Sequence, residues 1–449
     1  MSRSGHPNVV VFFTDQQRWD TTGVAGNPLG LTPHFDRLAQ EGTHVANSFT
    51  CQPVCGPARS CLQTGMYATQ TGCWRNGIAL RQDATTLARC FNKAGYATGY
   101  IGKWHLGGSE PVKEPERGGY EYWLAANALE MTSDTYRTDV FDNDNRPVRL
   151  PGYRVDALTD AAIRYIDSHQ RNPFFLFLSF LEPHHQNHLD DYPPPDGYRT
   201  PYTERWVPPD LAALGGSTHQ HLGGYYGMVK RLDEAFGRTY DALKSLNLLD
   251  DTIVLFTSDH ACHFKTRNAE YKRSCHESSI HVPTLFYGPG FQGGGRVREL
   301  VSLVDLPPTL LDAAGIPAPP QMVGKSILPL LRGDKKGWPE EVFVQISESQ
   351  VGRAVRTQRW KYSVFAPGKN GNQDSGSDHY VEEFLYDLEY DPYELTNLIG
   401  LKSHEETANV MRERLLRRMS AAGEAIPTIE RAPSRPGGQR RVTPEEARA

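Results

Sequence analysis

The segment from Asn8 to Gln16 reads NVVVFFTDQ, an apolar run that stops at an acidic residue and an amide. Its β-branched and aromatic side chains do not alternate with polar ones, which is typical of a strand buried on both faces of a parallel sheet. Residues 252–258, TIVLFTS, repeat the pattern and stop at Asp259 and His260. The two runs therefore predict two buried strands that end in polar side chains.

Two further apolar runs behave in the same way. Residues 96–101 lead into GKWH at 102–105, and residues 174–181 lead into EPHH at 182–185. Helical segments are expected before the later strands, at residues 86–93, 156–169 and 228–246. An alternation of helices and buried strands predicts an α/β fold, with a mostly parallel mixed sheet sandwiched by helices.

Polar residues gather where these apolar runs end. Ligands of such sheets bind at the carboxyl ends of the strands, so the four ends predict one shared site. A single aspartate there could equally cap a turn, and a lone histidine is more often structural, so the prediction depends on their convergence. The candidates are Asp15, Gln16, Lys103, His105, His184, Asp259 and His260.

This set offers two kinds of chemistry. Its carboxylate and amide oxygens, with His260 as a nitrogen ligand, suit Ca²⁺ or Mg²⁺ better than a softer metal. Its lysine and its other two histidines supply cationic or proton-transferring groups. A metal beside such groups is what an anionic, oxygen-rich substrate requires.

The cysteines allow several interpretations. Their number is odd and no CxxC pair is present, which argues against a disulfide framework and a zinc ribbon. Position 61, six after Cys55, is a cysteine, so the phosphatase spacing of cysteine and arginine is absent. Buried thiols or a reactive Cys55 remain. The seven are Cys51, Cys55, Cys61, Cys73, Cys90, Cys262 and Cys275.

Size and charge narrow the class of protein. The 449 residues are enough for a large core and more than one domain, and the net charge of −5 does not favour a nucleic-acid or membrane partner. No apolar run is long enough to cross a bilayer. The first apolar run is short and ends at Asp15 without a cleavage site, so we expect a strand rather than a signal peptide, and a cytoplasmic location.

Composition also predicts three regions along the chain. Residues 5–335 are expected to form the catalytic domain, followed by a connector at 334–339. Residues 340–420 are expected to form a smaller α+β domain with an antiparallel sheet. Residues 423–449 are rich in Arg, Pro, Gly and Glu, which predicts a flexible tail.

The motifs together resemble a known family. Residues 55–65, CGPARSCLQTG, look like the signature C-x-P-x-R-x-x-x-x-T-G of type I, formylglycine-dependent sulfatases of the alkaline phosphatase superfamily. Residues 102–107, GKWHLG, resemble a second signature, and the resemblance extends over residues 7–400. Other blocks follow in the expected order, at 259–260, 276–283, 305–309, 385–388 and 391–392.

The resemblance implies a fold like that of alkaline phosphatase and a reactive centre at Cys55. In this family a separate formylglycine-generating enzyme oxidises the cysteine, within a sequence that includes Pro57 and Arg59. The aldehyde hydrates to a diol, one hydroxyl attacks sulfur and expels the alcohol, and deprotonation of the other hydroxyl releases sulfate. This is covalent catalysis that divides one difficult step into two.

The resemblance also implies residue roles. Arg59 would hold the modified side chain, Lys103 and Lys272 would bind sulfate oxygens, His105 would be the base, and His184 would bind sulfate and protonate the leaving oxygen. One metal ion, normally Ca²⁺ with Mg²⁺ or Mn²⁺ as alternatives, is expected. Its ligands would be Asp15, Gln16, Cys55 in its modified form, Asp259 and His260.

Three functions stay open from the sequence. The first is hydrolysis of a sulfate ester, of a sulfated sugar or another small organic sulfate. The second is hydrolysis of a phosphonate monoester or phosphodiester by relatives that share the signature and a D-Q start, which Gln16 keeps open. The third is a non-catalytic binding protein in which Cys55 stays a thiol. His185, His188 and His276 have no assigned role, and the oligomeric state is not predicted.

Overall fold

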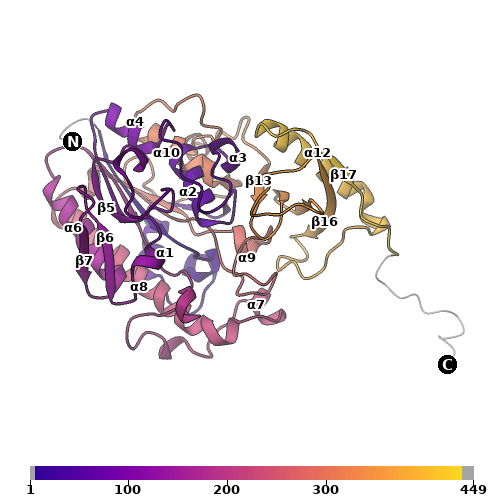
Figure 1. Ribbon diagram of the computed structural model, residues 1–449, viewed down its shortest axis with the longest axis horizontal. Coiled ribbons are helices and arrows are strands. Elements are labelled where there is room, and N and C mark those ends of the chain that lie inside the picture. The colour runs from indigo at the N-terminus through magenta and orange to yellow at the C-terminus, as the bar shows by residue number, and fades with distance from the viewer. Residues whose placement is uncertain (1–5, 437–449) are drawn as a thin grey trace, which may run out of the picture.

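The computed structural model describes residues 6–436, and its largest element is a ten-stranded sheet (Figure 1). Five neighbouring strands at its centre run parallel, and antiparallel strands lie on both sides of them. In spatial order the strands are β11 (Gly295–Val297), β2 (Thr43–Val45), β10 (Leu285–Tyr287), β9 (Thr252–Ser258), β1 (Asn8–Thr14), β8 (Phe174–Ser179), β4 (Ala97–Lys103), β5 (Tyr122–Ala126), β6 (Arg137–Phe141) and β7 (Pro147–Pro151).

The predicted buried strands are confirmed at the centre of this sheet. β1 lies between β8 and β9, and every residue of the three strands is buried. Alternate side chains of β1 enter two separate cores: Val9, Val11 and Phe13 one, Val10 and Phe12 the other. A strand that fills two cores has no polar face, which explains the absence of alternation in NVVVFFT.

Helices cover both faces of the sheet, as the sequence predicted (Figure 1). Side chains of α2 (Cys55–Thr64), α4 (Leu87–Lys93) and α10 (Leu306–Ala313) fill the first core. Those of α1 (Pro33–Glu41), α6 (Arg154–Ser168) and α8 (Thr218–Ser245) fill the second.

Helix α8 begins ten residues before the predicted start at 228, because glycines weaken the helical pattern of its first turns. These glycines are present because the helix packs closely against the loop 192–203. A Cβ atom at Gly224 would lie 2.2 Å from the carbonyl oxygen of Tyr192, and one at Gly227 would lie 2.7 Å from that of Tyr198. A strong helix former would not fit at either position.

A second, five-stranded sheet forms the small C-terminal unit, with α12 (Glu405–Ala421) packed on it. Four strands are antiparallel neighbours, as predicted. The fifth, β17, pairs in parallel with β16 inside the segment predicted to be a tail, because the backbone groups of an edge strand accept a further partner. The strands are β13 (Glu341–Ile346), β14 (Gly352–Thr357), β15 (Trp360–Phe365), β16 (His379–Asp387) and β17 (Thr428–Glu430).

The remainder of the predicted tail, residues 437–449, lies outside the described residues. The domain boundaries at 335, 340 and 420 stay a prediction. Within residues 6–436, the search for a helix with the length and hydropathy needed to span a bilayer finds none.

Buried charges join the small sheet to the large one. Lys361 of β15 is fully buried, and its Nζ lies 2.7 Å from Glu277 Oε1 and 2.6 Å from Glu394 Oε1. Arg356 of β14 approaches the same Glu277 carboxylate at 3.3 Å. Because Glu277 opens α9 (Glu277–Ile280), just after the predicted site residue Lys272, the small sheet is anchored beside the predicted site.

Gly102, at the end of β4, is required by both backbone conformation and space. Its φ is +106°, and a Cβ atom there would lie 1.8 Å from the backbone oxygen of Ser179 on β8. Gly102→Ala is expected to lower the free energy of unfolding by about 3 kcal/mol. The matched control Gly72→Ala, where φ is +84° but no atom lies within 4 Å, is expected to cost about 1–2 kcal/mol. Urea unfolding measures both, and equal losses would contradict the steric argument.

Candidate active site

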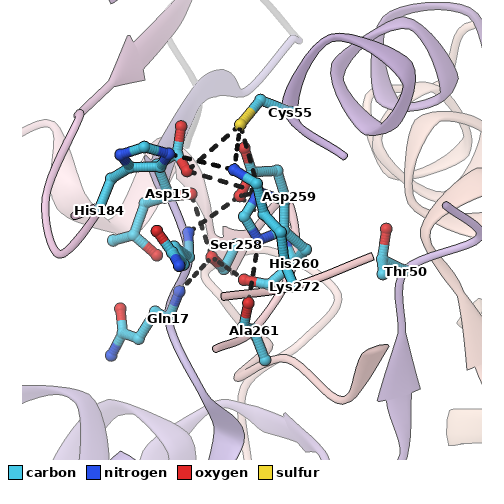
Figure 2. Close-up of polar contacts among 12 residues, drawn as sticks. Asp15, Gln17, Thr50, Cys55, His184, Ser258, Asp259, His260, Ala261 and Lys272 are labelled. Carbon is cyan, nitrogen blue, oxygen red and sulfur yellow. Dashed lines mark hydrogen bonds and ion pairs between the residues drawn. The ribbon is translucent and has the colours of Figure 1, made fainter. Parts of the chain in front are cut away.

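The four predicted strand ends meet at one edge of the large sheet. Figure 2 shows Asp15, His184 and Asp259, which follow three of these strands, gathered near Cys55. Asp15 follows β1, Lys103 ends β4, and Asp259 follows β9. Cys55 is the first residue of α2, whose N-terminus lies over this edge. The Cys55 Sγ atom lies 3.3 Å from His260 Nε2 and 3.8 Å from Asp15 Oδ1. Sequence segments far apart in the chain are thus brought to one buried sulfur.

Asp15, Cys55, Asp259 and His260 form a group suited to a metal ion. Their ligand atoms all lie within 4.8 Å of one another, and all four residues are buried. The Nδ1 atom of His260 bonds the Ala261 carbonyl at 3.0 Å, which leaves Nε2 as the ligand nitrogen. Asp259 Oδ2 is buried without a hydrogen bond among the described residues, and its one ion pair is with Arg59 Nη2 at 3.3 Å. Two carboxylates and one imidazole nitrogen form a donor set that a divalent cation accepts, so the residues fit the predicted metal.

The electrostatics of the two carboxylates agree with this assignment. Burial, together with the neighbouring Asp15, raises the pKa of Asp259 to about 6. Burial and Cys55 act in the same direction on Asp15, but Lys103, His184 and Arg59 outweigh them and hold the pKa of Asp15 well below its usual range. A divalent cation would also stabilise the ionised form of Asp259.

Gln16 lies at the site in a left-handed conformation, with φ of 68°. Its backbone N–H donates to Asp259 Oδ1 at 3.0 Å. Its side-chain Oε1 accepts from the His185 N–H at 3.2 Å, and its Nε2 contacts Cys262 Sγ at 3.4 Å. The residue therefore orients Asp259 and the loop after β8, while direct metal binding by its amide oxygen stays a prediction.

Arg59 and Lys103 enclose Asp15. Arg59 Nη2 donates to Asp15 Oδ2 at 2.9 Å, and its Nη1 donates to Ser179 Oγ at 2.7 Å. Lys103 Nζ contacts the same Asp15 oxygen at 2.9 Å and Glu130 Oε1 at 3.1 Å. Both cations are buried, so each requires a carboxylate partner.

Glu130 was not found from the sequence. It lies four residues after the end of β5, a fifth strand of the sheet. The residues between Ala126 and Glu130 are uncharged, so no polar cluster marks the end of this strand. Despite burial, the Lys103 ammonium lowers the pKa of Glu130 to about 2. A search extended a few residues beyond each apolar run would have included it. Asn76 was also missed, and its Oδ1 accepts the Gly56 N–H at 2.9 Å, near the start of α2.

Lys272 and His184 lie beside the sulfur of Cys55 (Figure 2). Lys272 Nζ lies 2.9 Å from Cys55 Sγ and 3.1 Å from His184 Nε2. The Nδ1 atom of His184 bonds the His185 carbonyl at 2.5 Å, so Nε2 faces the lysine as an acceptor. Burial, together with Lys272, lowers the pKa of His184, which favours this neutral form.

A small cavity of about 100 Å³ opens in front of the sulfur. At about 30 Å³ for each water of the liquid, it has room for three waters or one small oxyanion. His105 lines it, with φ of 60° and a buried Nδ1 that has no hydrogen-bond partner among the described residues. The wall comprises Gln16, Cys55, Asn76, His105, Glu130, His184, His185, Asn187, Glu270, Tyr271, Lys272 and Arg273.

Two histidines without an assigned role lie outside this wall. His276 is buried between Ser274 Oγ and Tyr386 Oη, each at 3.1 Å. His188 is half exposed and pairs with Asp134 at 2.9 Å. Every residue predicted for the site is therefore placed around the metal group or the cavity, and the third unassigned histidine, His185, joins them.

A buried nucleophile, a candidate metal group and cationic walls suit transfer of a small oxyanion from an ester. The family model described as Sulfatase matches residues 7–316. The chain belongs to the sulfatase family. A second model, described as N-sulphoglucosamine sulphohydrolase, C-terminal, matches residues 270–421. The resemblance seen in the motifs is confirmed, and the enzyme is a sulfuric ester hydrolase.

Individual relatives agree with this assignment. The ulvan-active sulfatase of Formosa agariphila is 30% identical over 441 residues, covering 93% of this chain and 82% of the relative. A Bacteroides fragilis structure described as a sulfatase has a TM-score of 0.83 at 25% identity and covers 95% of this chain and 98% of that one. A phosphonate monoester hydrolase of Agrobacterium radiobacter shares the fold, with a TM-score of 0.71, 23% identity and coverage of 93% and 96%.

The sulfatase site predicts the titration of Cys55 before modification. Burial opposes ionisation, but Lys103 and Lys272 outweigh it and hold the pKa of the Cys55 thiol well below its usual value. The thiolate thus contributes stability that is fully present above the unfolded pKa of about 8.5 and is lost as pH falls through the folded pKa. Lys272→Met is expected to raise the thiol pKa and to reduce that contribution.

Thiolate absorbance against pH, in metal-free unmodified protein, measures the shift. Lys265→Met is the control, because Lys265 lies over the Tyr271 ring, with Nζ 4.7 Å from its centroid. An identical titration in Lys272→Met and in the parent protein would contradict the assignment of Lys272 to the sulfur.

Proposed function

We propose that this sulfatase removes sulfate from a small sulfated saccharide, with Cys55 converted to formylglycine by a separate maturation enzyme. One observation carries the proposal: the Cys55 sulfur lies 2.9 Å from Lys272 Nζ and within 4.8 Å of ligand atoms from Asp15, Asp259 and His260. A thiol without function would not need this surrounding of charges. The side chain at 55 is therefore the proposed reacting group.

A saccharide substrate is supported by the relatives and by the cavity. The curated relative is named for its action on ulvan, and the second matching family model is named for N-sulphoglucosamine. The cavity has room for the sulfate group, so the sugar would contact the outer wall. Amide, carboxylate and guanidinium groups suited to sugar hydroxyls lie there, on Asn76, Asn187, Glu270 and Arg273.

Calcium is the proposed ion because the group contains two carboxylates, and hard oxygen ligands favour it. Asp15, Asp259 and His260 would hold it, together with the modified residue 55 and the amide of Gln16. When bound, the ion would lower the pKa of the nucleophilic hydroxyl and neutralise charge that develops on the sulfate oxygens.

The remaining residues bind the substrate and move protons. Lys272 contacts the sulfur at residue 55, Lys103 contacts the adjacent Asp15 carboxylate, and both would bind sulfate oxygens. His184 presents Nε2 beside Lys272, in position to donate a proton to the leaving oxygen once it is protonated. His105 lines the same cavity as Cys55, which suits a base. Arg59 donates a hydrogen bond to Asp15 and so orients that carboxylate.

Conversion of Cys55 is tested first by mass. Protein produced with the formylglycine-generating enzyme is expected to give a Cys55 peptide with the mass of formylglycine, whereas Cys61 in the same peptide region stays a cysteine. Cys55→Ala is expected to lose all sulfatase turnover because no nucleophile remains. An unmodified Cys55 in protein that is fully active would contradict the proposal.

Phosphonate monoester hydrolysis is the second candidate, supported by the Agrobacterium radiobacter structure and by Gln16 in place of a second acid. Aryl sulfate and aryl phosphonate with the same leaving group separate the two. The kcat/KM for the sulfate is expected to exceed that for the phosphonate by at least about tenfold, a difference of about 1.4 kcal/mol in transition-state binding. A faster phosphonate reaction would favour the second candidate.

A further inference from the structure

A second cluster of ligand-type side chains adjoins the cavity, and two of its members, His185 and Tyr271, belong to the cavity wall. His185 and Asp190 belong to the loop after β8, His221 belongs to the first turns of α8, and Tyr271 precedes Lys272. Ligand atoms of His185, Asp190 and His221 all lie within 4.8 Å of one another. None of these four residues belongs to the calcium group described above.

Three atoms of this cluster form a triangle with equal sides. His185 Nε2, Asp190 Oδ1 and Tyr271 Oη are each 3.1 Å from the other two. His185 Nδ1 lies 3.1 Å from the carbonyl oxygen of the Asn187 side chain, which can only accept, so the proton of a neutral imidazole is on Nδ1 and Nε2 carries a lone pair.

The neutral triangle is short of protons. The Tyr271 hydroxyl can donate to one neighbour only, which leaves two acceptors facing each other at 3.1 Å. A cation above the triangle resolves this. A tetrahedral zinc ion with bonds of about 2.0–2.1 Å has its ligand atoms about 3.3 Å apart, close to the observed sides.

His221 supplies an independent observation. Its side chain is 1% exposed, and its Nδ1 has no hydrogen-bond partner among the described residues. Asp191 Oδ1 lies 3.8 Å from that nitrogen, too far for a hydrogen bond but near enough to attract a cation. A buried imidazole with a nitrogen that has no partner, and with a ligand nitrogen within 4.8 Å of the ligand atoms of His185 and Asp190, is the state expected of a metal ligand.

We propose that His185, Asp190 and His221, with the Tyr271 hydroxyl as a fourth donor, bind a divalent transition metal of the zinc class. Two imidazoles and one carboxylate form a softer donor set than that of the calcium group, so the two sites select different ions. The Asp190 side chain is 64% exposed, which leaves the site an entry from solvent.

The metal would act on the active site as a positioning element. His185 follows His184, and Tyr271 precedes Lys272, so two of the ligands are chain neighbours of the two residues that face the sulfur. The His185 N–H also donates to Gln16 Oε1 at 3.2 Å. Fixing the loop after β8 and the segment before Lys272 to the start of α8 would hold His184 and Lys272 at their mutual distance of 3.1 Å.

The test measures Co²⁺ binding to the full chain by its visible absorption, followed by displacement with Zn²⁺. A parent variant with Cys55→Ser and Asp259→Asn removes the thiolate and one carboxylate from the other metal group. This parent is expected to bind one equivalent of Co²⁺ with the spectrum of a four- or five-coordinate ion. Because the readout is metal binding, it is independent of the proposed sulfatase reaction.

Two further substitutions locate the ion. Asp190→Asn and His221→Ala, each in the parent, are expected to weaken Co²⁺ binding at least about tenfold. His188→Ala is the matched control, because His188 lies in the same loop and pairs with Asp134 instead. Asp190→Asn changes an exposed side chain and keeps the test valid if His221→Ala does not fold.

Three results would overturn the proposal: no Co²⁺ bound by the parent, unchanged binding in Asp190→Asn, or an equal loss in His188→Ala. The first would indicate that His185 is protonated and pairs with Asp190 without a metal.

Discussion

The structure depends on the neutralisation of one buried carboxylate, that of Asp15. A carboxylate removed from water is costly unless cations and hydrogen-bond donors replace the solvent. Arg59 from α2 and Lys103 from β4 both lie 2.9 Å from its Oδ2 atom, so the charge ties the start of a helix to the ends of two strands. The surplus of positive charge that this requires also surrounds Cys55. Asp15, Arg59 and Lys103 therefore stabilise the fold and also form part of the anion-binding pocket.

The sequence predicted what depends on local pattern. The apolar run before Asp15 and the similar run before Asp259 predicted two central strands and the candidate metal ligands that follow them. A strand buried on both faces is apolar along its whole length, so the sequence reveals it directly. Glu130 and Tyr271 were missed, since Glu130 lies in a four-residue helix, α5 (Leu129–Thr132), and Tyr271 in a loop, and neither segment is long enough to show a periodic pattern. The early start of α8 was missed because Gly224 and Gly227 satisfy packing partners 20 or more residues away in the chain. The strand β17 was missed because it forms by pairing with the free edge of β16, which the local sequence of residues 428–430 does not indicate.

The small C-terminal unit also contributes to the active site, through a carboxylate in the connection between β13 and β14. Glu348 Oε1 accepts the Asn76 N–H at 2.7 Å, and Glu348 Oε2 pairs with Arg273 at 2.5 Å. Both partners line the cavity. The outer wall, where a saccharide would bind, is thus shaped jointly by the two sheets, while the reacting centre belongs to the large sheet alone.

The buried ion network around Glu277 has a consequence for the modularity of the chain. Lys361 and Arg356 come from the small sheet, whereas Glu277 belongs to the segment that returns to the large one. Truncation before β13 would remove both cations from that carboxylate and would expose Phe49, Ile280 and Leu300, which pack in one apolar cluster with residues of the small sheet. The C-terminal region is therefore not a detachable accessory. Shuffling it between homologues would require Glu277 and its two partners to be exchanged as one unit.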